Sequence, residues 1–269
     1  MFISEKLRRC AETFASEAGK CLGDRALSVY LYGSVVLGDY REGWSDIDMI
    51  CFSSEPIGAE AAEELLMLRQ ALVSACGEPL YRKIEGAAVC GEEFSAGRYR
   101  RLVYWGTSGQ RITDRYCFDC FSMWELLRCG VLLRGQDIRE RMTLPTYPEL
   151  VSGVRGHYET IRTYAKETDE SVYSCGWLLD IARCLYTLRY GEVIGKTAAG
   201  EWAVKERLCP DVCLTDMERT LAIRKAPSAY LGRDETKAWL RTLGKSVQTF
   251  ADVLEKELQT TGNFPSAML

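Results

Sequence analysis

The stretch LYGSVVLGDYREGWSDIDMI, residues 31–50, carries the strongest structural signal in the sequence. It begins inside Leu27–Gly33, an apolar, β-branched and aromatic run that ends at a glycine, which predicts a buried strand followed by a turn. It ends in Asp46–Phe52, DIDMICF, which predicts a second strand. Because side chains alternate between the two faces of a strand, Asp46 and Asp48 are expected to project from the same face, a few ångströms apart.

The two carboxylates and the preceding turn together predict a phosphate and metal site. Two like charges held close together are unfavourable unless a cation neutralises them, and carboxylate oxygens suit Mg²⁺. Gly33 permits a tight turn and a close approach of the backbone, while Ser34 and the N–H groups behind it can bind phosphate oxygens. This combination favours transfer of a nucleotidyl group, in which metal ions neutralise charge on the phosphate.

A third predicted strand, KIEGAAVC at Lys83–Cys90, supplies another carboxylate. If this strand pairs beside Asp46–Phe52, Glu85 could share the metal ions or remove a proton from an attacking hydroxyl. A D-x-D pattern alone is common by chance, and a glutamate in a strand is usually solvated. The full order of strand, Gly-Ser, turn, D-x-D strand and later strand carboxylate favours the catalytic interpretation.

Length and charge restrict the class of protein. At about 150 residues per domain, 269 residues suggest two domains. A net charge of −4 and a pI near 5.4 argue against a nucleic-acid partner. No apolar run is long enough to cross a membrane, and MFISEKLRRC lacks the apolar core of a signal peptide, so we expect a cytoplasmic protein with no membrane association. The single histidine, His157, excludes multi-histidine zinc sites.

The twelve cysteines are expected to be reduced thiols. Cys117 and Cys120 form a C-x-x-C pair, and Cys209 and Cys213 could in principle complete a four-thiolate zinc site. Cysteine is also a small apolar residue that packs well in protein interiors. We favour this second interpretation and leave open whether Cys117 and Cys120 bind a metal.

The remaining pattern separates a mixed first half from a helical second half. Pro145 and Pro148 mark the boundary, and the segment at 91–115, with arginines beside Tyr99, Tyr104 and Trp105, has no clear periodicity. The apolar spacing predicts helices near residues 2–20, 56–76, 118–128, 172–190, 196–208, 215–224 and 234–258.

These motifs resemble the nucleotidyltransferase superfamily that includes DNA polymerase β. More narrowly, LYGS (31–34) and SDID (45–48) are similar to the N-terminal pattern of the bacterial streptomycin/spectinomycin adenylyltransferases. In the second half, IARCLYTLRYGEVIGKTAAGEW (181–202) and AYLG (229–232) follow further motifs of that family. The resemblance implies an α/β (α+β) nucleotidyltransferase domain with a mixed sheet at residues 1–147, followed by an all-α helical bundle at residues 148–269.

The resemblance also implies roles for individual residues. Asp46, Asp48 and Glu85 would bind Mg²⁺, and Glu85 would be the catalytic base. ATP would be the nucleotide donor, held by Gly33, Ser34, Ser45, Arg183, Lys196 and Tyr230.

The acceptor side follows the family pattern less closely. The family places an acidic pair just before the helix that carries Arg183, where this chain has Tyr173 and Ser174, with Asp169 and Glu170 a few residues upstream. The family's tryptophan-bearing substrate segment is echoed only by Tyr104-Trp105. Trp105 and Tyr173 are therefore the expected acceptor contacts.

The expected reaction is Mg²⁺-dependent transfer of AMP from ATP to a hydroxyl of an aminoglycoside-like small molecule, with release of pyrophosphate, as in antibiotic resistance. Two alternatives stay open: a protein or RNA acceptor, as in toxin–antitoxin systems, and a non-catalytic nucleotide-binding module. Modules of the second kind usually lose a metal carboxylate, and none is missing here. We expect a monomer, although the sequence does not define an oligomeric state.

Overall fold

The chain folds into two compact units in a computed structural model that describes residues 4–106 and 109–261. The first unit comprises Met1–Tyr40 and Ser45–Leu144, and the second comprises Arg41–Trp44 and Pro145–Leu269. Together they confirm the predicted fold class, a mixed sheet with helices followed by a helical region. The expected boundary between residues 147 and 148 falls in the first turn of a helix, three residues beyond the division between the units.

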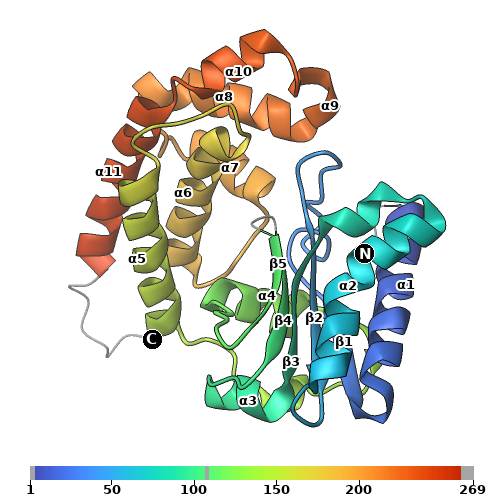
Figure 1. Ribbon diagram of the computed structural model, residues 1–269. Helices are drawn as coiled ribbons and strands as arrows, with labels where there is room; N and C mark the ends of the chain where they lie inside the picture. Colours follow the sequence, from blue (N-terminus) through green and yellow to red (C-terminus); the bar gives the residue numbers. More distant parts are fainter. Residues whose placement is uncertain (1–3, 107–108, 262–269) are drawn as a thin grey trace. The chain divides into compact units, whose positions relative to one another are not determined.

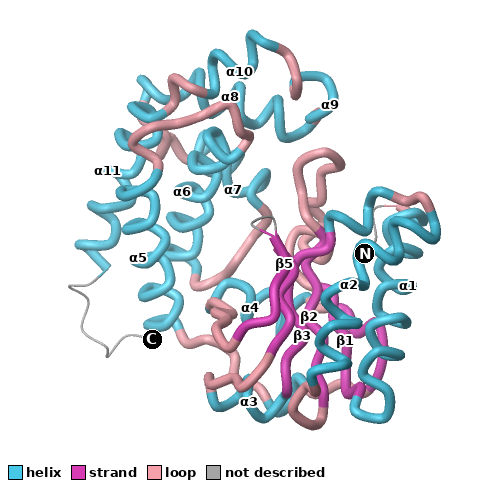
Figure 2. The backbone as a smooth tube through the Cα atoms, in the orientation of Figure 1, coloured by secondary structure: helices cyan, strands magenta, loops and turns pink. Residues whose placement is uncertain are grey.

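A six-stranded mixed sheet forms the centre of the first unit (Figures 1 and 2). The strand order is β5-β4-β3-β2-β1-β6; β2 and β3 are parallel, and the other neighbours are antiparallel. The strands are β1 (Ala26–Leu31), β2 (Ile47–Ser53), β3 (Ile84–Cys90), β4 (Leu102–Gly106), β5 (Gly109–Thr113) and β6 (Val131–Gly135).

The two faces of this sheet carry separate hydrophobic clusters. On one face, α1 (Glu5–Leu22) and α2 (Ala59–Cys76) pack against residues such as Met49 and Trp105. On the other face, Tyr32, Ile50 and Ala87 pack with Leu126 of α4 (Cys120–Cys129). Alternation along each strand therefore decides whether a side chain points toward α1 and α2 or toward α4.

The second unit is a bundle of helices. Its helices are α5 (Tyr147–Tyr164), α6 (Tyr173–Tyr190), α7 (Lys196–Lys205), α8 (Asp211–Lys225), α9 (Pro227–Tyr230), α10 (Asp234–Leu240) and α11 (Gly244–Thr261). The short segment Arg41–Trp44 belongs to this unit, where the Arg224 guanidinium lies 5.2 Å from the centre of the Trp44 ring. No helix in the described ranges combines the length and the apolar character that crossing a membrane would require.

Several predicted elements are confirmed and one needs correction. The strands at β1, β2 and β3 and the helix at α6 lie where the sequence predicts them. The helix predicted at 234–258 is two helices, because the chain turns at 241–243 between α10 and α11. The segment 91–115 contains the short α3 (Gly91–Ala96) and the antiparallel strands β4 and β5.

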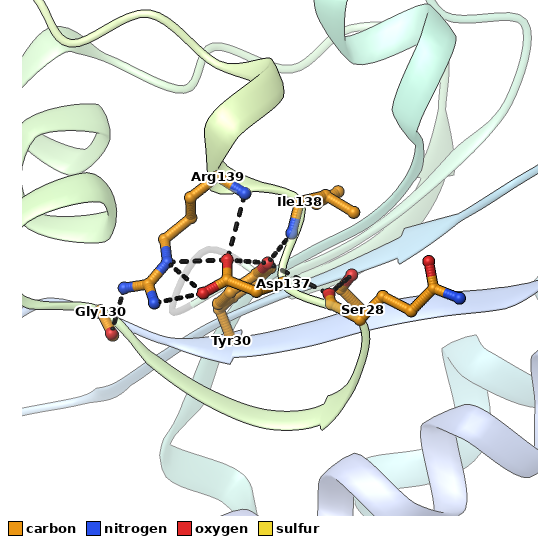
Figure 3. A network of polar contacts seen from close by, with 7 residues as sticks. Ser28, Tyr30, Gly130, Asp137, Ile138 and Arg139 are labelled. Carbon is orange, nitrogen blue, oxygen red and sulfur yellow. Dashed lines mark hydrogen bonds and ion pairs between the residues drawn. The ribbon is translucent and has the colours of Figure 1, made fainter.

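A polar network ties the end of β6 to β1 (Figure 3). The Tyr30 hydroxyl donates to Asp137 Oδ1 at 3.0 Å and accepts from the Ile138 N–H at 2.7 Å. Arg139 binds the same carboxylate through Nε at 2.9 Å and donates from Nη1 to the Gly130 carbonyl at 2.8 Å. The Arg139 guanidinium holds the pKa of Asp137 well below its usual range. The network thus fixes β1, the strand that leads into Gly33.

Candidate active site

Asp48 and Glu85 lie side by side on the sheet. They are register partners in the parallel pairing of β2 with β3, so their side chains emerge on the same face. Each stands two residues before a residue of the cluster on the α4 face, Ile50 and Ala87 respectively. The structure therefore brings together the two carboxylates that the sequence places 37 positions apart.

The turn after β1 presses against Asp48. Tyr32 N–H donates to the Asp48 carbonyl at 2.9 Å, and the chain then turns at Gly33, which has a φ of +71°. A Cβ at Gly33 would overlap the Asp48 carboxylate and come within 2.6 Å of its Cγ. Glycine is therefore required both by the left-handed backbone conformation and by the close approach of this carboxylate.

The Ser34 hydroxyl is a candidate ligand-binding group. Its Oγ is buried and has no hydrogen-bond partner within the described residues. Buried hydroxyls in proteins are nearly always hydrogen-bonded, so an unpartnered one needs an explanation. A phosphate oxygen, as predicted from the sequence, would provide the missing partner.

Asp48 is also under electrostatic strain. Burial, together with the like charges of Glu125, Glu85 and Asp46, raises the pKa of Asp48 to about 8, although a hydrogen bond from the Ser34 N–H opposes the shift. A carboxylate in this environment favours either a proton or a cation. The donor set fits a hard divalent cation, whose charge would offset this repulsion.

Asp46 lies just before β2 and already has a cationic neighbour. Its Oδ1 is 3.4 Å from Lys83 Nζ, and its side chain is 18% exposed. Within residues 4–106 and 109–261, no three His, Cys, Asp or Glu side chains are grouped as a metal site. A cation held by Asp46 and Asp48 would therefore need further oxygen ligands, which phosphates can supply.

Tyr104, rather than Trp105, accompanies Glu85. The Tyr104 hydroxyl donates to Glu85 Oε1 at 3.1 Å, and the Arg111 guanidinium stacks 4.5 Å from the Tyr104 ring centre. Trp105 points to the opposite face, is fully buried, and donates from Nε1 to the Leu65 carbonyl at 2.9 Å. Alternation along β4 thus argues against the predicted acceptor contact at Trp105, and Tyr104 is a residue that sequence reasoning missed.

Two predicted nucleotide-binding cations lie together in the second unit. Lys196, the first residue of α7, has its Nζ 2.8 Å from Asp180 Oδ1. Arg183, one turn after Asp180 on α6, has its Nη2 3.6 Å from the same oxygen. Burial would raise the pKa of Asp180, but Lys196 and Arg183 outweigh it and lower that pKa, with His157 contributing. Neither Asp180 nor His157 is assigned a role by the sequence motifs.

The other predicted residues lie in less constrained places. Ser45 is buried in the first unit, next to Asp46. Tyr230 ends α9 and is half-buried, with the Arg233 guanidinium 6.0 Å from its ring centre. Tyr173 begins α6 and is 57% exposed. The two acidic residues upstream of Tyr173 have local partners. Asp169 accepts hydrogen bonds from the Ser171 N–H and the Ser174 hydroxyl, and Glu170 forms an ion pair with Arg241.

The cysteines are free thiols throughout the described ranges. Cys117 is exposed and Cys120 is half-buried, while Cys209 and Cys213 are buried. Burial raises the pKa of Cys209 to about 12, which disfavours the thiolate that metal binding needs.

Comparison with known proteins agrees with both halves of this description. Residues 11–76 match the family model of the nucleotidyltransferase domain, and residues 149–257 match that of the aminoglycoside adenylyltransferase C-terminal domain. The first half is therefore similar to nucleotidyltransferase domains, and the second half is similar to the C-terminal domain of aminoglycoside adenylyltransferases. Asp46 and Asp48 lie within the first matched segment, and Arg183 and Lys196 lie within the second.

Two solved structures are similar to the chain to different degrees. The spectinomycin adenyltransferase AAD(9) from Enterococcus faecialis, solved with ATP and spectinomycin, has a TM-score of 0.61 and 16% identity, covering 90% of this chain and 97% of its own. At this identity the match supports the shared fold. A chain of the tri-AMPylated Shewanella oneidensis HEPN toxin complex with MNT antitoxin has a TM-score of 0.26 and 13% identity, covering 58% and 91%. That score is too low to support a common fold.

Proposed function

We propose that the protein transfers AMP from ATP to a hydroxyl of an aminoglycoside-like small molecule and releases pyrophosphate, with a requirement for Mg²⁺. The observation that carries the proposal is the pairing of Asp48 with Glu85 beside the unpartnered Ser34 hydroxyl. The sequence resemblance assigns the same residues to the metal, the base and the nucleotide.

The chemistry is divided among the residues of the first unit. Glu85 takes the proton of the acceptor hydroxyl, whose oxygen attacks the α-phosphorus as the bond to the pyrophosphate oxygen breaks. The Tyr104 hydroxyl orients the Glu85 carboxylate for this transfer. Asp46 and Asp48 would hold Mg²⁺ together with phosphate oxygens, and the ion when bound supplies charge neutralisation on the phosphates.

The remaining assignments complete the proposal. Gly33, Ser34, Ser45 and Tyr230 bind the nucleotide, and Arg183 and Lys196 bind its phosphates. Tyr173, exposed at the start of α6, contacts the acceptor. We propose that the protein acts as a cytoplasmic monomer. The neighbour solved with ATP and spectinomycin supports ATP as donor and a small-molecule acceptor.

The proposal is tested by incubating the protein with labelled ATP, Mg²⁺ and a panel that includes spectinomycin and streptomycin. Glu85→Gln is expected to lower the rate of labelling by about 10²–10⁴-fold, the range typical of a lost general base. Glu92→Gln, which makes the same change on an exposed turn of α3, is the matched control and is expected to retain activity.

The acceptor class is decided by what becomes labelled. Label in a cell lysate that appears on protein or RNA, with no antibiotic labelled, would contradict the small-molecule proposal. Tight ATP binding with no transfer to any acceptor would favour a non-catalytic module. Full activity of Glu85→Gln would remove Glu85 as the base.

A further inference from the structure

Asp180 contacts both of the cations that the sequence assigns to the nucleotide. Its Oδ1 lies 2.8 Å from Lys196 Nζ and 3.6 Å from Arg183 Nη2. All three side chains are largely sheltered from water, with 16% of Asp180, 30% of Lys196 and 15% of Arg183 exposed. Ion pairs sheltered in this way are screened less than those on a protein surface.

The surrounding helices hold Asp180 at a fixed place. Asp180 and Arg183 are separated by one turn of α6. Lys196 reaches the same oxygen because α7 packs tightly against α6. A Cβ at Gly200 of α7 would lie only 2.7 Å from Leu179 Cδ2 of α6. The other titratable group that acts on Asp180 is His157 of α5. The carboxylate is therefore part of the packed bundle rather than a mobile surface group.

A nucleotide that binds Lys196 and Arg183 must compete with this carboxylate. Phosphate oxygens and the Asp180 carboxylate carry the same sign of charge and use the same donors. Binding therefore exchanges an ion pair inside the protein for one with the ligand, and leaves Asp180 as a like charge near the phosphates. Both effects weaken binding of the nucleotide and of released pyrophosphate.

We propose that Asp180 is a counter-ion that Lys196 and Arg183 exchange for the phosphates of a nucleoside triphosphate, so that it weakens phosphate binding and favours release of pyrophosphate. The proposal rests on the proposed function, which assigns the two cations to the nucleotide. Asp180 acts through its partners and is a positioning residue. It lies outside the family motifs that identify Arg183 and Lys196.

The test measures binding of ATP with Mg²⁺, and of inorganic pyrophosphate, to the full chain by calorimetry. Asp180→Asn keeps the shape of the side chain and removes its charge, and is expected to tighten both Kd values by about tenfold, the size expected for one nearby unit charge at a partly buried site. The slope of log Kd against log salt should also become steeper, because the Asp180 charge no longer offsets the two cations that meet the phosphates.

Two further variants separate charge from structure. Asp180→Glu keeps the charge and is expected to stay within about twofold of the unchanged protein. Asp252→Asn removes the same charge from the same unit, where it pairs with Arg162, and is expected to leave both Kd values unchanged.

A counter-ion role and a purely structural role of Asp180 predict opposite changes in ligand binding. If Asp180 serves only to hold the bundle together, Asp180→Asn will bind ATP and pyrophosphate equally or more weakly, and this result would overturn the proposal. Equal tightening in Asp252→Asn would also overturn it, because the effect would then come from net charge. If the unchanged protein bound neither ligand, the proposed function itself would fail. If it bound both ligands and Asp180→Asn bound them no more tightly, only the counter-ion role of Asp180 would fail.

Discussion

Replacing Gly33 by alanine tests how closely the turn is fitted to Asp48. Gly33 has a φ of +71°, and a Cβ there would overlap the Asp48 carboxylate, 2.6 Å from Cγ and 2.8 Å from Cβ. Gly38, at the end of the same turn, has a φ of +70°, but a Cβ there would meet no atom within 4 Å. The two glycines therefore share a backbone conformation and differ in their surroundings.

The pair separates two energetic costs. A non-glycine residue in the left-handed region costs about 1 kcal/mol, and this cost applies to both Gly33→Ala and Gly38→Ala. Only Gly33→Ala must also move Asp48, so we expect it to lower the free energy of unfolding by a further 1–3 kcal/mol or so, as is typical of forced overpacking. Displacing a catalytic group by about 1 Å can lower activity by about 100-fold.

Urea unfolding and the AMP-transfer assay measure the two effects separately. We expect Gly38→Ala to keep its activity and Gly33→Ala to lose about 100-fold. In an Asp48→Ala background the extra loss of stability at Gly33→Ala should shrink, because two of the three close atoms are gone. Equal stability losses in the two single variants, with activity retained in both, would show that the turn does not press on Asp48.

Three further changes probe the first unit. Tyr104→Phe removes the 3.1 Å hydrogen bond to Glu85, and we expect kcat to fall by about tenfold with little change in the KM for ATP, measured by steady-state kinetics. Asp48→Asn should stabilise the metal-free protein near pH 8 by about 1–2 kcal/mol. The pKa of Asp48 is about 8 in the folded protein and 3.8 when unperturbed, so the stability of the unchanged protein decreases as the pH rises from 3.8 to 8. Thermal unfolding at pH 5 and at pH 8 should show the difference between the two proteins. Asp137→Asn loses the contact with Arg139 and should cost about 1 kcal/mol or less at pH 7, since the carboxylate is 45% exposed. Because the pKa of Asp137 is lowered in the folded state, this difference should be full above pH 3.8 and shrink as the pH falls from 3.8 toward the lowered pKa, which acid unfolding curves would reveal.

The first two strands were predictable because their sequence signal is local. The Gly-Ser turn and the D-x-D strand lie within 20 residues of each other, and β2 begins at Ile47, directly after Asp46. Glu85 required one further assumption, that its strand pairs beside β2, and the parallel register supports it.

The acceptor side was not predictable in the same way, because it depends on register. A shift of one residue along β4 exchanges Tyr104 for Trp105 on the face that carries Glu85. A single sequence does not define that register, and the resemblance to the family's tryptophan-bearing segment predicted Trp105 instead of Tyr104. Asp180 was missed for a related reason: an acidic residue on a helix is usually solvated, and its contact with Lys196 depends on how α7 packs on α6.

Each unit holds a cluster of charges whose ligand preference can be tested separately. In the first unit, Asp48 is buried among other carboxylates and needs a proton or a cation. In the second, Lys196 and Arg183 converge on the single oxygen of Asp180 that a phosphate would replace. A divalent cation would satisfy the first arrangement, and a phosphate group would satisfy the second. Comparing the binding of ATP with and without Mg²⁺ in the Asp48→Asn and Asp180→Asn variants would assign each preference to its own unit.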